Sequence, residues 1–67
     1  MQKELAEEIS LLLLNTATEM TELLSRIHKQ GSEYEFNKYS ESFNSIMGLM
    51  YVEVLSPIYH EYPDLKP

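Results

Sequence analysis

The segment Gln30-Gly31-Ser32-Glu33-Tyr34-Glu35 contains the signals that end one helix and begin another. Gly31 follows a long run without glycine or proline, and glycine is favoured just past a helix end because it adopts the left-handed conformation without strain. Ser32 and Glu35 have the spacing of a capping box, in which each side chain accepts a hydrogen bond from the backbone amide of the other. Two helices joined by so short a connection run antiparallel. The segment therefore predicts an all-α helical hairpin with its turn at residues 30–32.

The residues before this turn, 3–29, have the pattern of one long helix. Their apolar positions alternate at spacings of three and four, which is the heptad seam of helices that pack side by side. The seam consists of Ala6, Ile9, Leu13, Met20, Leu23 and Ile27, with Thr16 in its one polar position. Leu11 and Leu14 fall outside this seam, among polar residues. They indicate a second contact surface on the same helix.

The residues after the turn predict a second helix over 33–56. Its first half has a narrow apolar stripe, whereas residues 46–59 are apolar on nearly every side. A helix that is apolar all round is normally buried all round. A chain of 67 residues can hardly surround its own helix. We therefore expect a partner to cover part of residues 46–59.

Pro57 should interrupt this second helix, because proline lacks the amide hydrogen and crowds the preceding turn. Ser56 could cap a new short turn, with Pro57 at its first position. The sequence thus predicts a kink at Leu55–Ser56, a short turn over 57–61 and an extended tail over 62–67. A third helix formed by residues 57–67 folding back is disfavoured, because that segment contains few apolar residues.

The size of the chain favours oligomerisation. A core of about 70 residues supplies only about 3–5 kcal/mol, and small proteins usually add disulfides, a metal or a partner chain. The chain has no cysteine, and its two histidines, His28 and His60, fall at opposite ends of the hairpin. We expect two hairpins to dimerise into a four-helix bundle. The predicted dimer interface consists of Leu11, Leu14, Ser45, Gly48, Leu49, Val52 and Leu55.

The charge balance bears on the choice of partner. With 11 acidic and 5 basic residues the net charge is −6, which repels nucleic acid and anionic membranes and permits a basic protein partner. Tyr59, His60 and Tyr62 form a candidate partner surface, since tyrosine is favoured at interfaces. The alternative is an RNA- or DNA-binding hairpin dimer that uses basic residues near the turn. Those residues are Arg26, His28, Lys29 and Lys38, with Glu33, Glu35 and Glu41 among them.

No stretch of the sequence has the pattern of a catalytic, cofactor or metal site. Glu53 is the one charge within residues 46–59, and no residue suited to be its partner in acid–base chemistry is evident. No segment reaches the length of a membrane span, and the acidic N-terminus is unlike a secretory signal, so we expect a cytoplasmic protein. The sequence therefore predicts a small non-enzymatic helical protein that acts through homodimerisation and protein–protein interaction.

Overall fold

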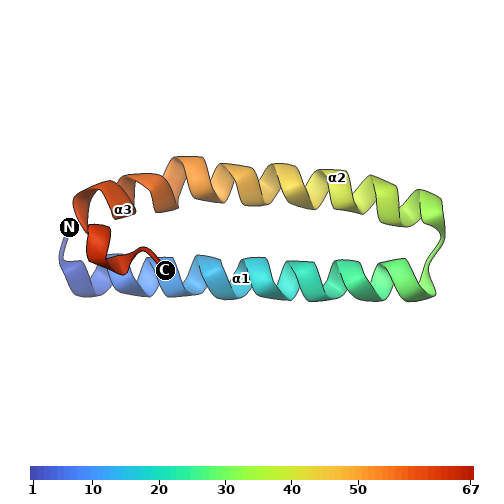
Figure 1. Ribbon diagram of the computed structural model, residues 1–67, viewed down its shortest axis with the longest axis horizontal. Coiled ribbons are helices and arrows are strands. Elements are labelled where there is room, and N and C mark those ends of the chain that lie inside the picture. Colours follow the sequence, from blue (N-terminus) through green and yellow to red (C-terminus); the bar gives the residue numbers. More distant parts are fainter.

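The chain is a long hairpin of antiparallel helices in the computed structural model, which describes residues 1–67 (Figure 1). Helix α1 spans Lys3–Gln30 and α2 spans Glu33–Leu49. A π-helical segment, η1 (Met50–Leu55), continues α2 into the short helix α3 (Ser56–Glu61), and a 3₁₀ turn, η2, follows at Pro63–Leu65. The molecule measures 44 × 16 × 15 Å. The helical hairpin predicted from the sequence is confirmed.

The turn is fixed by the predicted capping box. The Glu35 amide donates to the Ser32 hydroxyl oxygen at 3.1 Å, and the Ser32 amide donates to Glu35 Oε1 at 2.9 Å. These bonds satisfy two amides that the first turn of α2 would otherwise leave without partners. They also set the direction in which α2 leaves the turn.

Gly31 is required for a reason other than the predicted left-handed conformation. Its φ of −98° and ψ of −175° lie in the extended region, and its amide donates to the Ile27 carbonyl oxygen at 2.8 Å. A Cβ atom added at Gly31 would lie only 2.8 Å from that same oxygen. The close approach of the backbone to the end of α1, rather than a positive φ, therefore favours glycine here.

Pro57 is accommodated without the predicted cap at Ser56. Ser56 has helical dihedrals, φ −60° and ψ −47°, and its amide donates to the Tyr51 carbonyl oxygen, five residues back. A π-helix is wider than an α-helix, and this relieves the crowding between a proline ring and the carbonyl four residues before it. The chain thus stays helical from Glu33 to Glu61 and absorbs the proline in η1.

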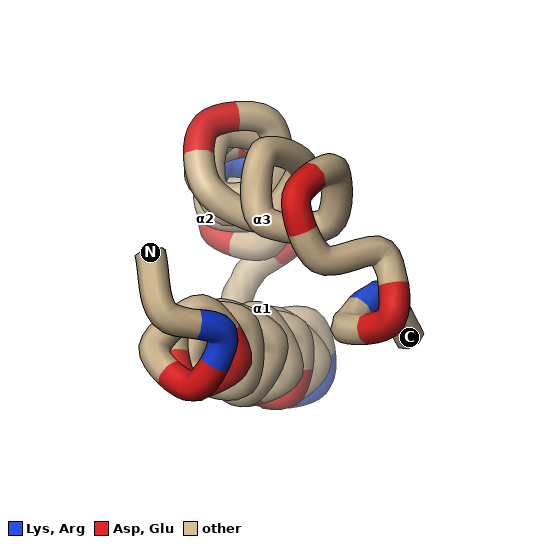
Figure 2. Tube along the Cα trace, turned by 90° about the vertical axis from the view of Figure 1, so that its left-hand side faces the viewer, with Lys and Arg blue, Asp and Glu red and all other residues tan.

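The core lies at the end of the hairpin that contains both termini. Ala6 of α1 packs against Leu55, Ile58 and Tyr59, and the partly buried Tyr62 and Leu65 pack onto this cluster. Ile58 and Tyr59 belong to residues 57–67, for which the sequence disfavours folding back. They nevertheless supply part of the core. The predicted extended tail is replaced by a strap, residues 62–67, which lies beside α1 (Figure 2).

Polar contacts hold the C-terminal end against the N-terminus of α1. The Tyr62 hydroxyl donates to the Met1 carbonyl oxygen, and the Lys3 ammonium pairs with Asp64. Inside the core, the hydroxyl groups of Ser10 and Tyr59 lie 3.3 Å apart in a buried hydrogen bond. These contacts place the strap along one side of α1.

Little of the chain is buried. Only 6 of the 67 residues are buried, and none of them belongs to α2. The accessible surface is 5122 Å², whereas a compact protein of the same mass would expose about 4,400 Å². The radius of gyration is 14.3 Å, against about 11 Å for a compact domain of this length. One hairpin therefore leaves apolar surface that a larger protein would cover.

The two glycines provide a matched test of the turn. Gly31→Ala should lower the free energy of unfolding by about 1 kcal/mol or more, because its Cβ meets a backbone oxygen. Gly48→Ala should raise it by about 0.5–1 kcal/mol, because nothing lies within 4 Å of the new Cβ and alanine is the better helix former. Urea unfolding followed by circular dichroism measures both. Equal effects of the two substitutions would contradict this account of the turn.

A second pair of substitutions tests the core formed by the folded-back segment. Ile58→Ala should cost roughly 2–5 kcal/mol, because a buried side chain is lost and a cavity remains. Val52→Ala, six residues earlier, should change the stability by less than about 0.5 kcal/mol, because Val52 is exposed. The same unfolding measurement applies. A negligible cost at Ile58 would show that the segment after Pro57 does not pack as described.

Candidate interaction surface

The residues predicted to form the dimer interface do not lie on one surface. Leu55 is only 6% exposed and belongs to the core, and Leu14 is partly buried against that core. Leu11 is exposed, but it follows Ala6 by five residues and so points about 140° away from it around α1. The remaining residues, Ser45, Gly48, Leu49 and Val52, are exposed on α2 and η1. Leu14 and Leu55 are thus covered by the chain itself.

The proposed C-terminal partner surface is also partly used within the chain. Tyr59 is 8% exposed and hydrogen-bonds Ser10. Tyr62 is partly buried, and desolvation, followed by the negative charge of Glu61, raises the pKa of its hydroxyl group. His60 alone of the three is exposed. Glu53, the charge within the apolar stretch, is exposed as well.

A different row of apolar side chains is exposed along α1. Leu5, Leu12 and Leu23 are separated by seven and eleven residues, which are close to two and three helical turns. They therefore lie in line on one side of the helix. All three are exposed, Leu12 by 63%. The sequence pattern placed Leu23 in the seam, but its side chain lies at the edge of the contact with α2.

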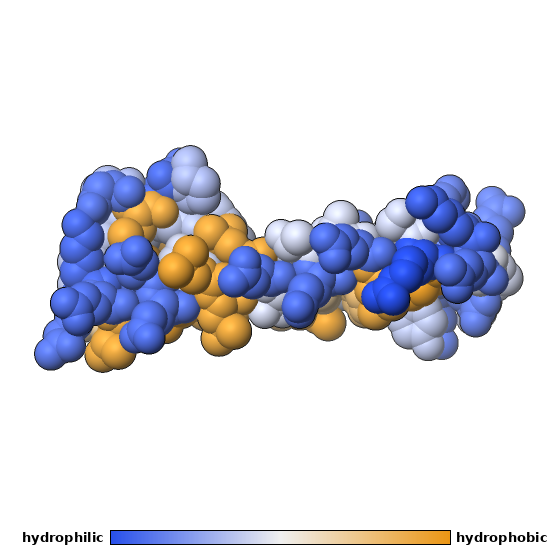
Figure 3. Space-filling model, turned by 90° about the horizontal axis from the view of Figure 1, so that it is seen from below, coloured by the Kyte–Doolittle hydropathy of each residue, from blue (hydrophilic) through white to orange (hydrophobic).

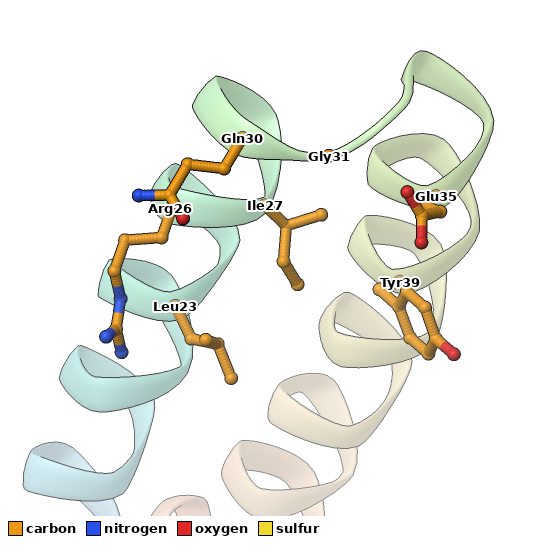
Figure 4. Close-up of a pocket in the computed structure, with 7 residues that line it drawn as sticks. All are labelled: Leu23, Arg26, Ile27, Gln30, Gly31, Glu35 and Tyr39. Atoms are coloured by element: carbon orange, nitrogen blue, oxygen red, sulfur yellow. The ribbon is translucent and has the colours of Figure 1, made fainter.

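A matching pair of side chains lies on α2. Tyr39 and Ile46 are exposed and two helical turns apart. Tyr39 lines the same hollow of about 390 Å³ as Leu23 and Ile27, so both rows lie on the same side of the hairpin. In Figure 4, Leu23 and Ile27 point into the space between the helices, the ring of Tyr39 lies across α2, and Arg26 and Gln30 lie on the outer side of α1.

These two rows define one lateral face, on the side of the hairpin away from the strap. Lys3, which holds Asp64 of the strap, and Leu12 are nine residues apart, or two and a half turns, so they lie on opposite sides of α1. The lateral face consists of Leu5, Leu12, Leu23, Tyr39 and Ile46. Figure 3 shows hydrophobic atoms gathered at the end that contains the termini and recurring along the lower edge of the molecule.

The rim of the lateral face on α1 is mainly acidic. Glu8 and Glu19 each stand one turn before a leucine of the face, and Arg26 is the cation on the same rim. At the turn the cations are mixed with aromatic rings and acids. His28 packs on Phe36 with ring centroids 4.4 Å apart, and Lys38 lies 5.6 Å from the Tyr39 ring centroid. The turn therefore presents no separate basic surface.

The lateral face has a signal in the sequence, but the same residues also fit the edge of the seam between the helices. Leu5 and Leu12 are a heptad apart at the edge of the seam, and Tyr39 and Ile46 repeat that spacing on the second helix. Either pair alone could lie at the edge of the contact between the two helices. Only the pairing of the two helices shows that both pairs emerge on the same side of the hairpin.

Comparisons with protein-family models, with curated proteins and with solved structures found no match for this chain. None of its helices combines the length and the apolar character needed to cross a membrane.

Acid should loosen both ends of the hairpin. Hydrogen bonds from Ser32 lower the pKa of Glu35, and the Lys3 ammonium lowers the pKa of Asp64. A carboxyl group whose pKa is lower in the folded state stabilises that state above its unfolded pKa, and the stabilisation is lost as the pH falls through the folded pKa. The free energy of unfolding should therefore decrease between about pH 5 and about pH 2.

Asp64→Asn should remove part of this pH dependence. Glu22→Gln is the matched control, because the Glu22 side chain makes no hydrogen bond or ion pair. Urea unfolding at several pH values gives the comparison. An unchanged slope in Asp64→Asn would show that the strap contact with Lys3 does not contribute to stability.

Proposed function

We propose that this chain is a non-enzymatic interaction protein that pairs with a second copy of itself through the lateral face. The observation that supports the proposal is the row of five large apolar side chains exposed on one side of a hairpin that buries so few residues. Two hairpins packed by these faces would form a four-helix bundle. In such a bundle each helix gains the second layer of neighbours that a single hairpin lacks.

The free energy gained by burying the lateral face exceeds the electrostatic repulsion between two copies. Each side chain of the lateral face is roughly half exposed, so covering the remainder contributes about 1 kcal/mol per residue. Repulsion between exposed rim carboxylates costs only a few tenths of a kcal/mol per pair. The chain exposes roughly 700 Å² more than a compact protein of its mass. This excess is close to the area of about 800 Å² that each partner buries in a standard protein–protein interface.

The strap makes the two sides of the hairpin unequal as packing surfaces. It lies on the opposite side of α1 from Leu12, at the end that contains the termini, and so hinders the packing of a second hairpin on that side. A surface that pairs with itself about a two-fold axis produces a closed dimer rather than a growing stack. The folded-back C-terminal segment thus favours a dimer over a higher oligomer.

Two aspartate substitutions test the contact. Leu12→Asp should dissociate the dimer, because it places a charge in the middle of the lateral face. Val52→Asp is the matched control, because Val52 is equally exposed, at 63%, but lies on η1 among the residues of the interface predicted from the sequence. Sedimentation equilibrium should give twice 7.8 kDa for the unmodified chain and for Val52→Asp, and 7.8 kDa for Leu12→Asp.

Salt provides a further control in the same experiment. Each copy carries a charge of −6, so added sodium chloride should strengthen the dimer by screening the repulsion between copies. Dissociation by Val52→Asp but not by Leu12→Asp would move the contact to the outward side of α2. A monomeric unmodified chain at all salt concentrations would refute the proposed homodimer.

A further inference from the structure

A second apolar surface lies on the outward side of α2 and η1. We call it the outer ridge; it consists of Ser45, Gly48, Leu49 and Val52. Leu49 and Val52 are 60% and 63% exposed, which places them among the most exposed apolar side chains of the helices. A Cβ added at Gly48 would have nothing within 4 Å. Bare helix backbone is therefore open to solvent beside Leu49, between Ser45 and Val52.

The outer ridge is separate from the surface proposed for dimerisation. Ser45 stands two residues from both Phe43 and Met47, which are partly buried toward α1. Two residues correspond to about 200° around an α-helix, so Ser45 points away from α1. Val52 continues the outward line seven residues later. Packing through the lateral face would leave a ridge exposed on each copy.

The charges around the ridge identify the kind of partner that it fits. No charged residue occurs between Ser42 and Val52, and the uncharged stretch is flanked by Glu41 and Glu53. Neither glutamate takes part in an ion pair. The outer ridge has only two large apolar side chains, so a second copy would bury little apolar area on it, whereas a cationic partner would also pair with the two glutamates. The net charge of −6 attracts such a partner over a longer range.

We propose that the outer ridge binds a basic amphipathic helix of another protein. An apolar side chain of that helix sits over Gly48, beside Leu49 and between Ser45 and Val52, as a ridge of one helix packs into a groove of another. Lysine or arginine residues about 18 Å apart reach Glu41 and Glu53, which are twelve residues apart. This inference names a partner for the proposed interaction role, but it does not require the dimer to form.

The test uses a synthetic 18-residue helical peptide with leucine on one face and lysine on the other, added to the ¹⁵N-labelled full chain. The largest amide shifts should fall within residues 45–56. Gly48→Leu should weaken binding at least tenfold, because the new side chain fills the open position. This variant should stay folded, since leucine is a better helix former than glycine. A peptide with glutamate in place of lysine should not bind.

Leu12→Asp separates this proposal from the dimer. The variant should bind the lysine peptide as the unmodified chain does, even if it is monomeric, because Leu12 lies on α1 away from the ridge. Shifts centred on the acidic residues of α1, or equal affinity of Gly48→Leu and the unmodified chain, would overturn the assignment of the ridge. Absence of binding by any form of the chain would also overturn it, while leaving the homodimer to be judged by its mass.

Discussion

Two helices joined by a tight turn can bury only the faces that meet, and the rest of this structure depends on that limit. The capping box of Ser32 and Glu35, with the close backbone approach at Gly31, commits the chain to a single antiparallel pair. The seam between α1 and α2 is then too narrow to enclose either helix. Ser10 and Leu24 of α1 are buried, but no residue of α2 is. Apolar residues beyond the seam remain at the surface.

The C-terminal segment makes the two sides of the hairpin different. The π-helical segment Met50–Leu55 lets the chain continue through Pro57, and Ile58 and Tyr59 then reach the core beside Ala6. The strap that follows is held on the Lys3 side of α1. One side of the hairpin is thereby covered at the end that contains the termini, whereas the other side presents the apolar lateral face. This asymmetry makes a closed pair of hairpins the simplest completion of the fold.

Local signals in the sequence were sufficient for the hairpin and insufficient for its surfaces. The capping box and the long apolar seam each act within a few residues, so the helices and their turn could be predicted. The path after Leu55 depends on contacts between Tyr59 and Ser10, which are 49 residues apart and carry no local pattern. The burial of Leu14 likewise depends on distant residues, so its position outside the seam suggests an exposed side chain. The folded-back segment that covers its surroundings was expected to be a tail.

We propose that one hairpin is an incomplete fold, which a second copy completes side by side. Small-angle X-ray scattering of the unmodified chain tests it most directly, because mass and length are obtained together. We expect a particle of twice 7.8 kDa whose long dimension stays close to the 44 Å of one hairpin. A particle of 7.8 kDa with a radius of gyration near 14.3 Å would contradict the claim, as would a dimer of nearly double length.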